Sequence, residues 1–175
     1  EGYLAPLVAA DGAEAVHEPG YDHVLVEART AGGEDWTTLP EVGGATSSEP
    51  PAECTTNPFL LAIHPFLESY LGEDCTPPGT TGDWHSLTGD SGGWTEVAYD
   101  LSGFAGGDVE VSISYVTDPG SGEIGVFVDD TDVVVDGVSD ADGFEGDTSV
   151  WSVGTVPPGS PPTATAWEIG AEAAA

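Results

Sequence analysis

Two groups of acidic residues have the chemistry to bind a hard cation. Asp129, Asp130 and Asp132 directly follow an alternating apolar segment. A second group lies in a predicted Gly-containing loop after it, namely Asp136, Asp140, Asp142, Glu145 and Asp147. Calcium takes several oxygen ligands, and a bound ion relieves repulsion between carboxylates. The second group is not an EF-hand, because alignment puts Val138 at the first ligand position and Ser149 at the twelfth. We therefore place the predicted calcium at Asp129, Asp130 and Asp132, where a strand end would fix the backbone; a solvated acidic face is the alternative.

Other patterns that could carry catalysis are weak. The segment Gly120-Ser121-Gly122-Glu123-Ile124-Gly125 matches a dinucleotide-binding pattern, but that pattern needs a following helix, and here an alternating strand follows. No pair among the four histidines has the helical spacing of a zinc protease, so we expect no zinc site in this chain. Ser91 lies in a Gly-rich turn and lacks the Gly-x-Ser-x-Gly elbow. An autonomous hydrolase that uses an unrecognised carboxylate or histidine site stays open as an alternative.

The two cysteines, Cys54 and Cys75, predict a disulfide, because there is no Cys-x-x-Cys pair and no further cysteine to complete a zinc site. Disulfides persist in oxidising compartments, so we expect a secreted, extracellular protein; two buried free thiols are the alternative. No apolar run is long enough to span a bilayer. The start at Glu1 without a methionine suggests a processed chain or a domain excised from a larger one.

The charge balance is extreme, with 32 Asp and Glu against one basic residue, Arg29, and a formal net charge of −31. Repulsion of this size excludes nucleic acid and anionic membrane surfaces as partners. It also destabilises a compact chain unless counterions screen it, and the Debye length shrinks from about 8 Å at physiological ionic strength to about 3 Å in 1 M salt. We therefore hypothesise a halophilic or salt-tolerant source; an ordinary acidic secreted domain is the alternative.

The first half of the chain predicts a hairpin followed by a disulfide-closed loop. Tyr21–Arg29 is rich in β-branched and aromatic residues, and Trp36–Leu39 can return as its partner. Residues 43–58 are rich in Gly, Ser, Thr and Pro, which predicts a loop. Apolar residues then recur at steps of three and four, with a proline suited to a first helical turn and a glycine to a helix end. We predict one short helix at about 65–71, inside the loop that the two cysteines close.

The second half predicts strands. Alternating or β-branched segments lie at 94–101, 109–115, 124–128, 132–136 and 150–153. Short strands at this frequency, separated by polar turns, favour an all-β fold, an antiparallel β-sandwich of jelly-roll-like form, over a βαβ fold. We expect a single such domain over residues 1–170, followed by a frayed Ala-rich end at 171–175.

The order of several motifs carries a family resemblance. They are Tyr21-Asp22-x-x-x-Val26-Glu27-Ala28, Asp35-Trp36-Thr37-Thr38-Leu39-Pro40, Gly82-x-Trp84-His85-x-x-Thr88-Gly89-x-Ser91-Gly92-Gly93-Trp94, and the segments 100–106, 109–115 and 125–130. Together, over about residues 20–167, they resemble the accessory β-sandwich (jelly-roll-like) domain of secreted actinobacterial metallopeptidases, which include zinc carboxypeptidase-like and immune inhibitor A-like proteins. The shared residues describe a scaffold, with Trp36, Trp84 and Trp94 as large core or edge aromatics.

The resemblance implies a non-catalytic accessory domain of a secreted zinc metallopeptidase, which supports stability or substrate engagement. Its partner would be the catalytic peptidase domain of the same polypeptide, with peptide or glycan as substrate. The alternative is a carbohydrate- or cell-surface-binding module, because an exposed aromatic ring can stack on a sugar. In that interpretation Trp36, Trp84 and Trp94 are the ligand aromatics.

Overall fold

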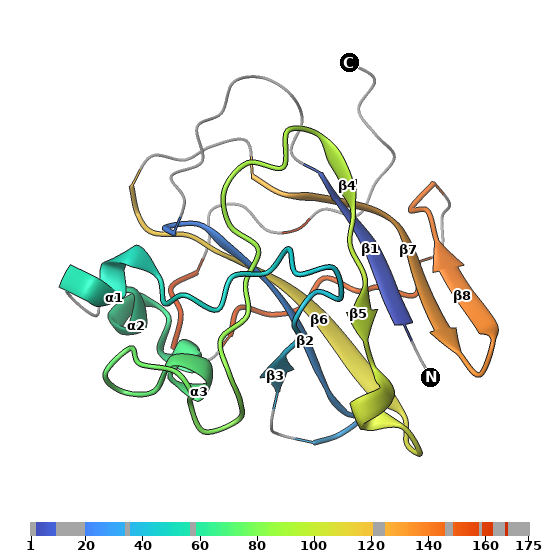
Figure 1. Ribbon diagram of the computed structural model, residues 1–175, viewed down its shortest axis with the longest axis horizontal. Coiled ribbons are helices and arrows are strands. Elements are labelled where there is room, and N and C mark those ends of the chain that lie inside the picture. The colour runs from blue at the N-terminus through green and yellow to red at the C-terminus, as the bar shows by residue number, and fades with distance from the viewer. Residues whose placement is uncertain are drawn as a thin grey trace.

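The structure, a computed structural model, describes residues 3–9, 20–33, 36–56, 59–120, 125–145, 149–157, 159–162 and 167. Its strands form two antiparallel sheets within this part of the chain, one of five strands and one of three (Figure 1). The mostly β, antiparallel character predicted from the sequence is confirmed. No helix among these residues is long and apolar enough to cross a membrane.

The five-stranded sheet is built around the first strand of the chain. Its strands are β1 (Tyr3–Ala9), β4 (Trp94–Glu96), β5 (Tyr99–Asp100), β7 (Phe127–Val135) and β8 (Val138–Asp142). The order is β4-β1-β7-β8, and β5 also pairs with β1. The register between β1 and β7 shifts between Ala5 and Leu7, on either side of Pro6, which has no N–H to donate to a neighbouring strand. The sequence patterns did not predict β1, although it joins both halves of this sheet.

The three-stranded sheet confirms the predicted hairpin. It contains β2 (His23–Thr30), β3 (Thr37–Thr38) and β6 (Val109–Val116) in the order β3-β2-β6. β2 and β3 pair through Glu27 opposite Thr38, and β6 pairs with β2 along its whole length. The alternation in 109–115 was informative because β6 packs its apolar face on the core and turns its serines to the opposite face.

β2 is buried on both faces, which makes it the centre of the fold. On one face, Leu25 packs in a cluster with Trp84, Tyr70 and the leucines of the helical segments. On the other face, Val26 and Ala28 pack in a second cluster, which includes Tyr99 and takes further contacts from the five-stranded sheet. The three-stranded sheet therefore lies between the five-stranded sheet and the helices, and Figure 1 shows α1–α3 on the side of the molecule opposite β8.

The disulfide and the helix within its loop are present, but the loop is more helical than expected. Cys54 and Cys75 are bonded, with 5.3 Å between their Cα atoms. The predicted helix at 65–71 is a 3-10 turn, η1 (Pro65–Leu67), running into α3 (Glu68–Leu71), and Gly72 ends it at φ 68°. The prediction of one helix was wrong, because α1 (Ala52–Thr56) and α2 (Phe59–Ile63) precede it; a second 3-10 turn, η2 (Ser102–Phe104), lies elsewhere.

The loop prediction for 43–58 failed at α1 for a tertiary reason. The composition of this segment favours turns, but the N–H of Ala52 donates to the carbonyl oxygen of Gly20 at 2.8 Å, and Cys54 is tied to Cys75. These long-range contacts hold a five-residue helix that local propensity would not form alone.

Four of the predicted strands need correction. Segment 132–136 and part of segment 124–128, predicted as two strands, contribute to one strand, β7, because a bulge at Asp130 (φ 49°) lets the ladder continue; Ile124 lies outside the described residues. Residues 94–101 form two short strands, β4 and β5, where one was expected. Residues 150–153 are not a strand; the N–H of Val150 donates to the Asp142 carboxylate at 3.0 Å and that of Trp151 to Ser149 Oγ at 3.0 Å.

Candidate functional site

The acidic residues expected to bind calcium lie within β7 and not after a strand end. Asp129 and Asp132 are in register with β1, opposite Leu7 and Ala5, and Asp130 occupies the bulge between them. Oδ1 of Asp129 accepts from the N–H of Asp130 at 2.8 Å, and Oδ1 of Asp132 accepts from Ser139 Oγ at 2.6 Å. Across the described ranges, no three His, Cys, Asp or Glu side chains are grouped so that they could hold a metal ion. Calcium at these residues therefore stays a prediction without structural support.

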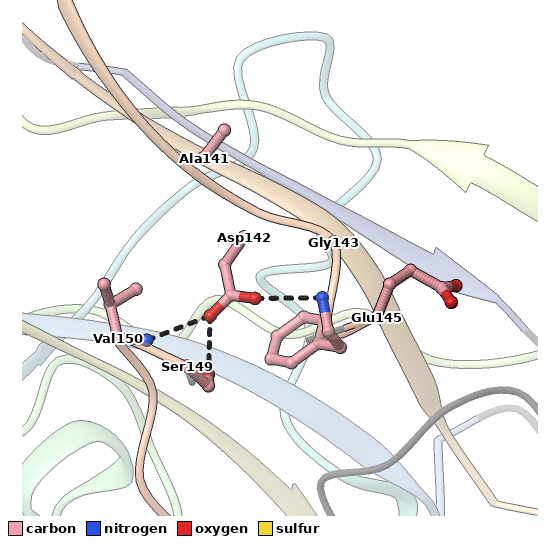
Figure 2. A pocket seen from close by; sticks show the side chains of 7 residues that line it. Ala141, Asp142, Gly143, Glu145, Ser149 and Val150 are labelled. Carbon is pink, nitrogen blue, oxygen red and sulfur yellow. Dashed lines mark hydrogen bonds between the residues drawn. The ribbon is translucent and has the colours of Figure 1, made fainter. Parts of the chain in front are cut away.

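Two residues of the second acidic group, Asp142 and Glu145, line an open hollow of about 400 Å³, which is formed by residues 141–145, 149 and 150 (Figure 2). Asp142 ends β8 and turns inward, whereas Asp136 and Asp140 are exposed; Asp147 lies outside the described residues. These positions correct the sequence interpretation of this stretch as a loop, because Val138–Asp142 pairs with β7 as a strand.

The Asp142 carboxylate is occupied by protein donors (Figure 2). One oxygen accepts from Phe144 N at 2.9 Å, and the other accepts from Ser149 Oγ at 2.5 Å and Val150 N at 3.0 Å. The Ser149 hydroxyl and these backbone N–H groups lower the pKa of Asp142, because they stabilise its charged form. Asp142 therefore fastens the chain after β8.

A buried Ser–His pair lies on the helical side of β2. His23 is 1% exposed, and its ring meets the edge of Trp84 with 5.1 Å between ring centroids. Nε2 lies 3.0 Å from the carbonyl oxygen of Gly20, so the neutral ring carries its proton there, and Nδ1 accepts from Ser86 Oγ at 3.0 Å. Burial lowers the pKa of His23 to about 4. Ser86 is 0% exposed, so no acyl substrate reaches the hydroxyl in this structure.

Glu27 is a buried carboxyl on the same face of β2. Its oxygens accept from Tyr70 Oη at 2.5 Å and from Ser114 Oγ at 2.6 Å, which ties β2 to α3 and to β6. Burial raises the pKa of Glu27, and the hydroxyl donors oppose that shift. Such perturbed groups are typical of active sites. Here, however, Glu27 is only 5% exposed and acts as a polar link inside the core.

The three tryptophans predicted as ligand aromatics do not form one surface. Trp84 is 0% exposed and belongs to the core on the helical side of β2. Trp36 is half-buried against the same core, with the Arg29 guanidinium carbon 4.3 Å from its ring centroid. Trp94, on β4, is 53% exposed. Only Trp94 of the three presents most of its ring to solvent.

Phe127, which the sequence interpretation did not single out, lies level with Trp94 on the five-stranded sheet. Both residues are in register with Ala9 of β1, Trp94 on one side and Phe127 on the other. Phe127 is 45% exposed. In the sequence, Phe127 was marked only by its place in the alternating segment that forms β7. Its alignment with Trp94 depends on β1, which pairs with the strands of both residues.

Comparison with known proteins associates the chain with a metalloprotease precursor. No family model matches the chain. Over 52 residues, or 30% of its length, the chain is 42% identical to the pre-pro-metalloprotease PrtV of Vibrio cholerae serotype O1, in two strains. The matched region is 6% of the length of those relatives. The chain thus resembles a small part of a much larger metalloprotease precursor.

Proposed function

We propose that this chain is a non-catalytic accessory domain of a secreted metallopeptidase, joined to the catalytic domain in one polypeptide. The observation that carries the proposal is the 42% identity over 52 residues to a small part of a pre-pro-metalloprotease. The polar groups with perturbed pKa values support it, because His23 and Glu27 serve the core. The Cys54–Cys75 disulfide supports an extracellular location.

The proposed architecture is a jelly-roll-like β-sandwich that extends over residues 1–170. Its support is the second hydrophobic cluster, to which both sheets contribute: Val26 and Ala28 from β2, Tyr99 from β5 and Val133 from β7. A scaffold of this kind suits stabilisation or substrate engagement, since it offers large sheet surfaces on a rigid core. The carbohydrate-binding alternative is weaker, because Trp84, one of its three proposed ligand aromatics, is fully buried.

The test compares the full parent protein with a version lacking this domain. We expect both to cleave a short peptide substrate with similar kcat, and the shortened protein to lose thermal stability or turnover of folded protein substrates. The isolated chain should hydrolyse neither substrate. A parent polypeptide without a peptidase domain, or peptidase activity in the isolated chain, would contradict the proposal.

A further inference from the structure

The outer face of the five-stranded sheet carries two exposed aromatic side chains on either side of β1. Residues directly opposite one another in antiparallel strands point to the same face, so Trp94 and Phe127, both opposite Ala9, share a face. They are 53% and 45% exposed. Because neighbouring strands lie about 4.8 Å apart, the two residues stand about 10 Å apart across the sheet.

Two carboxylates occupy the next row of the same face. Glu96 and Asp129 are both opposite Leu7, two residues from Ala9 along β1, so the alternation puts them on the face of Trp94 and Phe127. Glu96 is exposed. Each aromatic side chain therefore has a carboxylate neighbour on its own strand, two positions further along.

Burial of the residues in the opposite phase supports the assignment of these four side chains to the outer face. Val97 and Tyr99, in the opposite phase to Trp94 and Glu96, are buried in the core. In β7, the bulge at Asp130 reverses the alternation of side chains, so that Val133 contacts the core while Phe127 is exposed. On the outer face, Trp94, Phe127, Glu96 and Asp129 together form an aromatic–acidic patch.

The chemistry of this patch favours a cationic ligand. Lysine and arginine side chains stack on aromatic faces and pair with carboxylates, and the four residues offer both partners at each end of the patch. The net charge of −31 attracts a basic segment over a longer range. A sugar, by contrast, presents hydroxyls that need donors as well as acceptors, and Glu96 and Asp129 are acceptors when ionised.

The spacing also fits an extended peptide. In polyproline II conformation the chain rises about 3.1 Å per residue with three residues per turn, so side chains at i and i+3 point the same way about 9 Å apart. That separation matches the two strand spacings between Trp94 and Phe127.

We propose that the aromatic–acidic patch binds an extended basic peptide segment, with Lys or Arg at i and i+3 stacked on Trp94 and Phe127 and paired with Glu96 and Asp129. As a site for substrate engagement the patch rests on the proposed accessory function. Binding itself is measured on this chain without any peptidase, so failure of one proposal is distinguishable from failure of the other.

The test uses a fluorescein-labelled peptide, (Lys-Pro-Ser)4, and its acidic counterpart, (Glu-Pro-Ser)4, in fluorescence anisotropy titrations at low and molar salt. We expect the basic peptide to bind, and the acidic peptide not to bind. The double variant Trp94→Ala/Phe127→Ala should weaken binding at least tenfold. Its matched control is Val150→Ala/Val153→Ala, which removes an exposed apolar pair elsewhere and should leave binding unchanged.

A second pair of variants separates the patch from the general charge of the protein. Glu96→Gln/Asp129→Asn should weaken binding strongly, whereas Glu49→Gln/Asp74→Asn removes two exposed charges elsewhere and should have little effect. Equal losses in both double variants would overturn the proposal, since they indicate unspecific attraction. No binding of the basic peptide, or salt-independent binding of an uncharged oligosaccharide that needs Trp94 and Phe127, would overturn it as well. Thermal melts of every variant confirm that the fold is intact.

Discussion

Acidification should destabilise this protein through a single buried histidine. The His23 pKa is about 4 in the folded protein, against 6.5 for an ordinary histidine. Because its pKa falls on folding, the unfolded chain binds the proton more tightly between these values. The stabilisation that comes from keeping His23 neutral is therefore complete above about pH 6.5 and is lost as the pH falls toward 4.

The size of the effect follows from the two pKa values. At pH 5 the unfolded state has bound most of its proton and the folded state almost none, which lowers the free energy of unfolding by about 2 kcal/mol relative to pH 7.5. For a domain of this length that corresponds to a fall in Tm of about 4–8 °C. The structural cause is burial: the His23 ring is 1% exposed and lies against Trp84, which disfavours the charged form of the ring.

The assay is urea unfolding at a series of pH values for the wild type and for His23→Gln, with His85→Gln as the control. Titration of the acidic residues contributes to both proteins, so the difference between wild type and variant isolates His23. We expect this difference to change by about 2 kcal/mol between pH 7.5 and 5, and the half-buried His85 to contribute less. If His23→Gln does not fold, an NMR titration of the wild type gives the pKa directly. A His23 pKa near 6.5, or a difference independent of pH, would refute the reasoning.

Three further predictions concern stability. Replacing Cys54 and Cys75 together by Ser should lower the free energy of unfolding by about 3 kcal/mol, because the bond closes a loop with a sequence separation of 21. The check is that the variant and the reduced wild type have equal Tm values. A variant as stable as the oxidised protein would contradict the prediction. In the wild type, the raised pKa of Glu27 makes the folded state bind the proton more tightly than the unfolded state, so this contribution to stability is lost as the pH rises above about 4.5. Glu27→Gln removes the titrating group and should therefore flatten the pH dependence of stability in that range. Urea unfolding at pH 4.5 and 8 measures this, and parallel pH profiles for variant and wild type would count against it. Finally, Tm should rise between 0.05 M and 1 M salt, since salt screens the net charge of −31; a Tm indifferent to salt would remove the halophilic hypothesis.

The sequence pattern predicted those strands that pair with a near neighbour in the chain, and those whose two faces differ in polarity. The β2–β3 hairpin was predictable because Tyr21–Arg29 and Trp36–Leu39 are separated by a short Gly-containing turn. β6 was predictable because its apolar and polar residues alternate, and the structure puts them on opposite faces. The disulfide followed from the presence of two cysteines alone.

Other features depend on contacts that no local pattern contains. α1 forms in a segment of loop composition because Gly20 and Cys75, both distant in sequence, hold it. β8 forms from an acidic segment because each of its residues pairs with one in β7. The contact between His23 and Ser86 likewise joins positions 63 residues apart, so the burial that lowers the pKa of His23 could not be predicted from its neighbours in the chain.

β1 shows why the candidate site was only half predictable. Trp94 was named from the sequence as an aromatic that a ligand could contact, but the predicted companions Trp36 and Trp84 belong to the helical side of the fold. Its neighbour across the sheet is Phe127, because β1 lies between β4 and β7 and sets both registers. The same strand puts Glu96 level with Asp129, so one register determines the whole aromatic–acidic patch. A slip of β7 by one residue against β1 would put Phe127 and Asp129 on the face opposite to Trp94 and Glu96. The patch therefore depends on the bulge at Asp130, which sets the phase of Phe127 and Asp129 relative to the rest of β7.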